Sequence, residues 1–198
     1  MKLPGTLLII LLLSGFIACN SDPIPRPKGY FRIDMPQKSY QSFNRPDYPY
    51  SFEYPSYAQV VKDSTFFDDM PENPYWINLS FPQFDAQIHI SYKAINSPAA
   101  FQKLVDDAFS LTGKHSIKAN AIDELPIQGA DNAKGFLFDV GGNAATGKQF
   151  YLTDSTKNFI RGALYFNATP NYDSIKPVED FLYRDIEHFI KTFRWTNR

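Results

Sequence analysis

Strict alternation of apolar and polar residues in one short segment constrains the fold of this 198-residue chain more than any other feature. In AQIHISYK, residues 86–93, every second residue is apolar, which is the pattern of a strand with one buried face. The same alternation runs through residues 50–54 and 77–81. The connector PQFD at 82–85 predicts a hairpin between the last two of these strands.

A helix is predicted to begin at Ser97 and Pro98, because a capping residue is followed by proline at the first helical position. Gly113 is a suitable stop. The apolar residues between them recur at helical spacing and are expected on one face: Phe101, Leu104, Val105, Ala108 and Leu111.

Strand patterns then resume at about 117–127, 134–140, 148–154 and 158–167. A second amphipathic helix is predicted from about Pro177 to the end of the chain. Its apolar face comprises Val178, Leu182, Ile186, Phe189, Ile190 and Phe193.

This order of elements predicts an α+β domain, with a largely antiparallel sheet flanked by two amphipathic helices. The order resembles that of the PsbP-like α-β-α sandwiches. We find no internal repeat and no second domain boundary.

The N-terminus has the pattern of a secretory signal, with Lys2 before an apolar run. The stretch is too short and too broken by Pro4 and Gly5 for a spanning helix. The residues FIAC, ending at Cys19, resemble a bacterial lipobox, although Phe16 replaces the usual leucine. We therefore expect residues 1–18 to be a lipoprotein signal peptide and Cys19 to carry the lipid as a thioether.

The segment after Cys19 is rich in proline, which favours an extended spacer. We expect residues 19–29 to form the lipidated cysteine and its tether, and residues 30–198 to form one globular domain. Two or more acyl chains, such as palmitate, would hold the chain on a membrane of the cell envelope. Only one acidic residue follows Cys19 closely, so we expect the domain to face the periplasm.

Composition excludes several classes of protein. Lys and Arg total 20 against 21 Asp and Glu, so counterion release offers little affinity for nucleic acid, and no nucleic-acid partner is expected. A single cysteine rules out an intramolecular disulfide and a cysteine-cluster metal site.

Gly142–Lys148 fits the spacing of a phosphate-binding loop, GxxxxGK. Such a loop needs Ser or Thr next and then a helix. Gln149 stands there instead, and the following residues alternate like a strand. The pattern therefore favours a glycine-rich hairpin loop.

No other pattern in the sequence establishes a reaction centre. His89, His115 and His188 have no metal-ligand spacing, and no GxSxG elbow occurs. Residues 154–156 have the composition of a turn, in which an Asp carboxylate accepts backbone N–H groups. A hydrolase would need His89 or His188 to meet a carboxylate in a concave site.

The segment from residue 40 to residue 57 is rich in aromatic residues and proline. The prolines argue against a regular interior strand, so much of the segment is expected at an edge or in a loop. Its rings could pack over the sheet or form a partner surface. The residues of this candidate surface are Tyr40, Phe43, Arg45, Asp47, Tyr48, Tyr50 and Tyr57.

Several long blocks resemble the gliding-motility lipoprotein GldD family: PKGYFRIDMP (27–36), YPYSFEYPSYA (48–58), INLSFPQFDAQIHISYK (77–93), KHSIKANAI (114–122) and QFYLTDSTKNFIRGALYFNATPNYDSIKPV (149–178). The resemblance implies membership of the envelope machinery for gliding and type IX secretion. It supplies no catalytic residue, and the lipidated cysteine maps onto Cys19.

We therefore expect a non-enzymatic, membrane-anchored assembly or scaffold component that contacts other gliding and secretion envelope proteins. It needs no cofactor, metal or small-molecule substrate. The alternative is a glycan- or peptidoglycan-binding module that uses the aromatic residues of 40–57.

Overall fold

The structure is a computed structural model, which describes residue 29, residues 32–62 and residues 71–196. The chain divides between Ile33 and Asp34, and all the described helices and strands lie in the unit Asp34–Arg198. The expected signal peptide and Cys19 lie outside the described residues.

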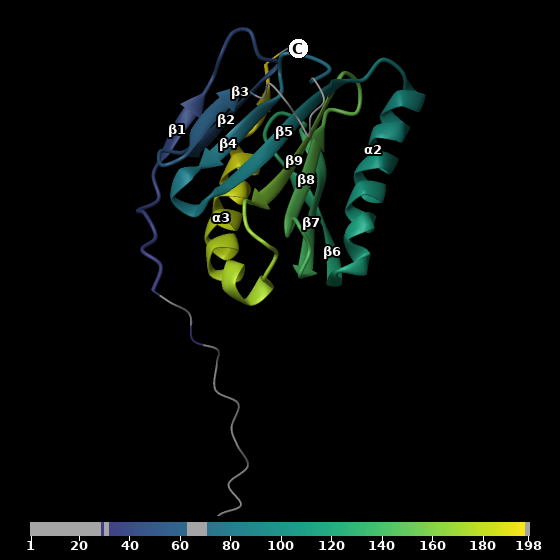
Figure 1. Cartoon of the computed structure of the whole chain (residues 1–198). Coiled ribbons are helices and arrows are strands. Elements are labelled where there is room, and N and C mark those ends of the chain that lie inside the picture. Colours follow the sequence, from purple (N-terminus) through teal and green to yellow (C-terminus); the bar gives the residue numbers. More distant parts are fainter. Residues whose placement is uncertain (1–28, 30–31, 63–70, 197–198) are drawn as a thin grey trace, which may run out of the picture. The chain divides into compact units, whose positions relative to one another are not determined.

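Two antiparallel sheets form the framework (Figure 1). The larger has seven strands in the order β3 (Gln59–Lys62), β4 (Ile77–Phe81), β5 (Ala86–Ala94), β9 (Asn158–Phe166), β8 (Lys148–Thr153), β7 (Lys134–Gly142) and β6 (Ala119–Gln128). The smaller has the order β1 (Tyr40–Phe43), β2 (Tyr50–Pro55) and β10 (Arg194–Trp195).

Two α-helices cover the larger sheet in the described part of the chain: α2 (Pro98–Gly113) and α3 (Tyr172–Thr192). Short 3-10 turns, η2 (Pro82–Phe84) and η3 (Lys114–Ile117), follow β4 and α2. Figure 1 shows α2 on one side of the seven-stranded sheet and α3 on the other. The predicted α+β class, with a largely antiparallel sheet between two amphipathic helices, is confirmed.

The strands β7, β8 and β9 divide their side chains between two apolar cores. Leu137, Phe150 and Ile160 pack with α3 and the smaller sheet, whereas Phe138 and Tyr151 pack beneath α2. This division follows from the opposite directions of successive side chains along a strand.

The helix predicted at 98–113 is observed with its expected start. The Ser97 hydroxyl accepts a hydrogen bond from the backbone N–H of Ala100 at 3.1 Å, and Pro98 occupies the first turn. The expectation for Leu111 is wrong: it is exposed, while Thr112 is buried. The other predicted stripe residues, Phe101, Leu104, Val105 and Ala108, do pack on the sheet, together with Phe109.

The last helix begins at Tyr172, five residues before the predicted start. Pro177 therefore lies inside α3 and removes one backbone donor from its second turn. The helix continues because its later residues, including Leu182 and Ile186, are fully buried against the sheet.

The hairpin predicted at 82–85 is observed. It is the turn η2, closed by Asp85 in the left-handed conformation at φ 46°, and it joins the antiparallel strands β4 and β5. The strands β1, β3 and β10 were not predicted as separate elements.

Candidate functional site

The aromatic segment 40–57 folds into β1, β2 and the turn between them. Phe43, Tyr48 and Tyr50 are 3%, 5% and 0% exposed. The Phe43 ring stacks on Phe52 at 4.8 Å between centroids, and Tyr50 stacks on Phe193 at 5.9 Å. These three rings therefore pack in the core, which was the first of the two alternatives for the segment. They offer little surface to a partner or a glycan.

Arg45 and Asp47 lie exposed in the turn between β1 and β2. The Arg45 guanidinium lies 5.3 Å from the centroid of the Phe43 ring. Of the candidate surface, this turn is the part that solvent reaches freely.

Tyr40 and Tyr57 are half-buried and meet at a carboxylate on α3. Tyr40 donates its hydroxyl hydrogen to Asp185 at 3.0 Å, and the Tyr57 hydroxyl donates to the other oxygen of Asp185. Lys38 Nζ lies 2.7 Å from the same carboxylate and 3.6 Å from the centroid of the Phe181 ring. Three groups from the N-terminal side of the domain thus hold one buried carboxylate.

Burial and hydrogen bonding change the titration of this cluster. Burial, with the hydrogen bond to Asp185, raises the pKa of Tyr40 to about 12 and also raises that of Tyr57. Burial lowers the pKa of Lys38, against the opposing effect of Asp185. Both tyrosines therefore stay protonated as donors at neutral pH, and the cluster is a structural clamp between the smaller sheet and α3.

Sequence patterns did not single out Asp185. A signal exists, because Asp185 lies one residue before Ile186 on the apolar stripe of α3, where a carboxylate is unexpected. Such a residue must be paired inside the fold.

The three histidines do not converge. His89 Nδ1 lies 2.6 Å from Asn78 Oδ1 on the larger sheet, and His115 lies in η3. His188 Nε2 lies 2.7 Å from Glu53 Oε2, and its ring stacks on Tyr40 at 3.6 Å. A histidine does meet a carboxylate here, but neither residue lines any of the three pockets of the domain considered below.

The glycine-rich segment joins β7 to β8, in agreement with the predicted hairpin loop. Lys148 is 4% exposed and forms ion pairs with Asp139 and, at 3.1 Å, with Glu179 of α3. Burial raises the pKa of Glu179. The pKa of Lys148 is also raised, because its two carboxylate partners outweigh burial, which would lower it. An amine held in this way is not available to phosphates.

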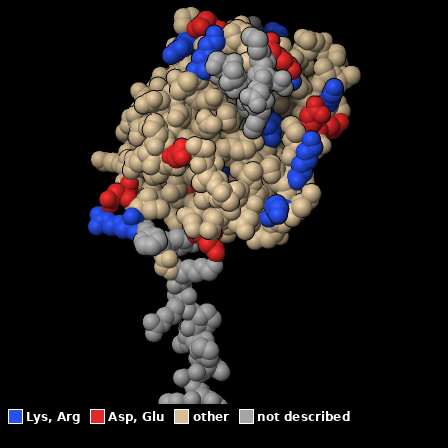
Figure 2. Space-filling model, viewed as in Figure 1, with Lys and Arg blue, Asp and Glu red and all other residues tan. Residues whose placement is uncertain are grey.

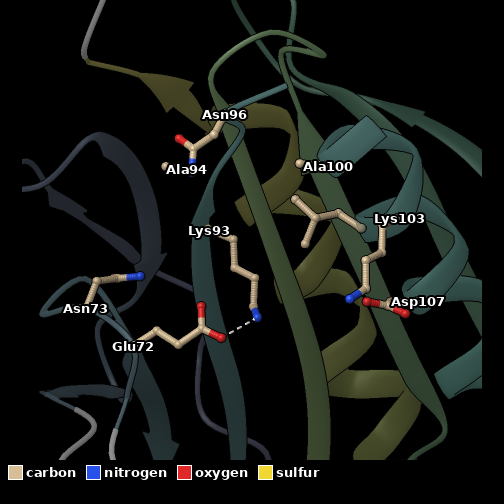
Figure 3. Close-up of a pocket in the computed structure, with 9 residues that line it drawn as sticks. Glu72, Asn73, Lys93, Ala94, Asn96, Ala100, Lys103 and Asp107 are labelled. Atoms are coloured by element: carbon tan, nitrogen blue, oxygen red, sulfur yellow. Dashed lines mark hydrogen bonds and ion pairs between the residues drawn. The ribbon is translucent and has the colours of Figure 1, made fainter. Parts of the chain in front are cut away.

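One pocket of about 340 Å³ lies between α2 and the end of β5. Figure 3 shows the Lys93 amine joined to the Glu72 carboxylate on one side of it, with Lys103 and Asp107 projecting from α2 on the other. Lys93 Nζ lies 2.7 Å from Glu72 Oε1. The lining provides amines, carboxylates and amides, but no Ser, His or Cys nucleophile.

A second pocket, of about 490 Å³, lies beside Phe101, Pro126 and Phe136, and a third, of about 20 Å³, adjoins Glu179. Within residues 29, 32–62 and 71–196, no three His, Cys, Asp or Glu side chains form a possible metal site. Over the same residues, no helix has the length and apolarity to span a membrane.

Charged side chains of both signs are mixed on the surface. Figure 2 shows Lys and Arg interspersed with Asp and Glu, mostly around the margin of the visible face. The visible face has no extended field of one sign that would attract a polyanion.

A family model for the gliding motility lipoprotein GldD matches residues 20–195. The chain belongs to this family. The match spans the whole of the described domain up to β10, so both sheets and both helices are parts of the family domain. Membership makes the chain a gliding-motility lipoprotein and supports anchorage in the cell envelope.

Comparison with curated proteins gives no match. Among solved structures, the chain is similar to cyanobacterial PsbP from Synechocystis sp. PCC 6803, at 12% identity and a TM-score of 0.41. That alignment covers 87% of this chain and 99% of the other. At this level of similarity we draw no functional conclusion from it.

Proposed function

We propose that this lipoprotein is a non-enzymatic assembly or scaffold component of the gliding and type IX secretion machinery. In this proposal it is anchored by Cys19, faces the periplasm and acts through contacts with other envelope proteins. The proposal requires no cofactor and no small-molecule substrate.

The observation that carries the proposal is that the three fully buried charged side chains of the described residues, Lys148, Glu179 and Asp185, are engaged in ion pairs. Asp185 is held by Lys38, Tyr40 and Tyr57, and Lys148 is held by Asp139 and Glu179. Groups with shifted pKa values mark active sites when they line a cleft. Here Glu179 adjoins only the pocket of about 20 Å³, and the paired groups join α3 to the two sheets, as a rigid binding domain requires.

The outer strand β6 offers a surface for partner contacts. Among the described strands it pairs only with β7, at the edge of the larger sheet. Leu125 on this strand is 42% exposed, and Ile117, just before it, is 86% exposed. Exposed apolar side chains beside an edge strand are suited to protein–protein contact.

The experiment that tests the function is a clean chromosomal deletion with plasmid complementation. We expect the deletion strain to lose colony spreading and to secrete less type IX cargo, and the wild-type copy to restore both. Normal spreading and secretion in the deletion strain would contradict the proposal.

The scaffold role is tested separately by photo-crosslinking in intact cells. A photoreactive residue at position 117 or 125 should give discrete adducts with envelope proteins, whereas one at Val61, which is 46% exposed on β3 at the opposite edge of the larger sheet, is the matched control. Adducts at none of several surface positions would argue against a scaffold role, whatever the deletion phenotype.

A further inference from the structure

Helix α2 covers only part of the sheet face on which it lies. Its apolar residues pack on β7, β8 and the start of β9, through Phe138, Tyr151 and Phe159. The rest of that face, on β4, β5 and β9, carries partly exposed polar side chains. We call these six residues the open face: Asn78, Gln87, His89, Ser91, Arg161 and Tyr165.

A small residue makes room at the edge of this open face. Ala163 is paired with His89 on β5 and with Gln149 on β8. Arg161 stands two residues earlier on the same face of β9, and its Nη2 donates a hydrogen bond to Oε1 of Gln149. The guanidinium therefore extends along β9 towards the level of Ala163.

The charge of Arg161 is not matched by an acid. Among residues 29, 32–62 and 71–196, no carboxylate forms an ion pair with it, and its side-chain acceptor is the amide of Gln149. Two other shielded cations among the described residues differ: Lys38 is paired with Asp185, and Lys148 is paired with two carboxylates. A partly buried guanidinium with a neutral partner retains an unmet demand for negative charge.

Hydrogen-bond donors outnumber acceptors around Gln149. Its Oε1 accepts from Arg161 and, at 3.3 Å, from Thr112. Its Nε2 is buried and has no acceptor within the described residues. Exchanging the amide oxygen and nitrogen would not help, because Nε2 would then face the guanidinium of Arg161, which can only donate. A buried donor without an acceptor costs about 1–3 kcal/mol.

Neighbouring histidine and tyrosine side chains add no negative charge. Burial lowers the pKa of His115, and the charge of Arg161 lowers it further. Burial raises the pKa of Tyr165, with Arg161 acting in the opposite direction. His115 is thus neutral and Tyr165 protonated at pH 7, so neither side chain offsets the positive charge of Arg161.

We propose that Arg161 on the open face binds an oxyanion, a carboxylate or a phosphate group, through its guanidinium. The planar guanidinium can hold two oxygens of such a group at once, which an ammonium cannot. Gln149 and Thr112 position the guanidinium from β8 and α2. This site does not depend on the scaffold role proposed above.

The test uses the full chain in detergent micelles, labelled for NMR of side-chain N–H groups. Acetate and inorganic phosphate are titrated separately at constant ionic strength, with chloride as the balancing ion. We expect saturable shifts of the Arg161 Nε–H and Gln149 Nε2–H signals, with half-saturation in the millimolar range. Saturation by acetate alone, by phosphate alone or by both identifies the source of the oxyanion.

Variants provide the matched control. Arg161→Gln should weaken the anion response of the Gln149 signal at least tenfold, and Arg161→Lys should weaken it less. Arg194→Gln should leave it unchanged, because Arg194 is an exposed arginine that lies 3.6 Å from Asp131. Where Arg161→Gln changes the fold, the wild-type titration alone decides. Linear, unsaturated shifts of similar size at Arg161 and Arg194 with both anions would overturn the site.

Discussion

Gly147 lies against the carboxylate of Glu179, so closely that a Cβ atom at residue 147 would overlap Oε2 of that side chain. Because residue 147 in the β7–β8 hairpin has no side chain, Glu179 of α3 can reach Lys148. The glycine that makes the sequence resemble a phosphate-binding loop has a packing role instead.

Replacing this glycine should therefore destabilise the domain. We expect Gly147→Ala to cost about 1–3 kcal/mol, the usual range for an overpacked site, because Glu179 must move away from Lys148. The measurement is the midpoint of urea unfolding. Gly113→Ala is the control: a Cβ there meets nothing within 4 Å, in a helical backbone, and we expect no loss. Equal midpoints for both variants would show that the close approach is not energetically important.

Lys148 and Glu179 should behave as a coupled pair. Lys148→Met leaves the Glu179 carboxylate, whose side chain is 7% exposed, without its main partner, and we expect a loss of about 3–5 kcal/mol. The double variant Lys148→Met, Glu179→Leu removes the unpaired charge and should recover much of the loss. A double-mutant cycle from urea unfolding measures the coupling, and additive losses would contradict a direct interaction.

Sequence patterns predicted those helices and strands that are determined by residues within one short segment. Ser97, Pro98 and the apolar stripe that follows determine α2 within one segment, and alternation determines β5. The start of α3 was placed too late because Pro177 suggested a boundary, whereas burial of Leu182 and Ile186 carries the helix through it.

The smaller sheet could not be predicted in this way. Its central strand β2 pairs with β10, which is only Arg194 and Trp195 at the other end of the chain. A strand of two residues is too short to show an alternating pattern in the sequence. For the same reason the Asp185 clamp was missed: its donors lie on β1, near β2 and before β1, and only the tertiary fold brings them to α3. The surroundings of Arg161 could not be predicted either, because they depend on the register of β5, β8 and β9, which no single segment encodes.

The aromatic residues of β2 should be essential for stability. Tyr50 is fully buried, and its hydroxyl donates to the backbone carbonyl of Tyr75. We expect Tyr50→Ala to cost about 3–5 kcal/mol and Tyr50→Phe about 1 kcal/mol, from the lost hydrogen bond. Arg45→Ala, in the exposed turn, should stay within about 0.5 kcal/mol of wild type. Thermal unfolding measures all three, and an unchanged melting temperature for Tyr50→Ala would rule out the core role.

Asp154 should contribute stability that depends on pH. Its Oδ1 accepts hydrogen bonds from the backbone N–H groups of Thr156, Lys157 and Asn158, with N···O distances of 2.8–2.9 Å. Burial alone would raise the pKa of Asp154, but these hydrogen bonds bring it below the ordinary value of 3.8. A lowered carboxyl pKa stabilises the fold above the unfolded-state value, and this contribution is lost as the pH falls through the folded-state value.

We therefore expect Asp154→Asn to be less stable than wild type by about 1–2 kcal/mol at pH 7, with the difference shrinking below about pH 4. Urea unfolding at a series of pH values measures the difference in unfolding free energy between the two proteins. The contributions of the other carboxyl groups are the same in both and cancel in this difference. Asp47→Asn, in an exposed turn, controls for the loss of one surface charge. A difference that stays constant from pH 7 to pH 2.5 would show that the charge of Asp154 is unimportant.

The last prediction concerns Cys19, which lies outside the described residues. Cys19→Ala removes the only thiol in the chain, so no thioether to a lipid can form. Without acyl chains, whose burial contributes about 0.8 kcal/mol per CH₂ group, the variant should leave the membrane fraction and take up no labelled palmitate. A strain that carries only this variant should spread poorly even though the domain is folded, because its concentration at the membrane is lost. Continued palmitate labelling of the variant would show that the lipid is attached elsewhere.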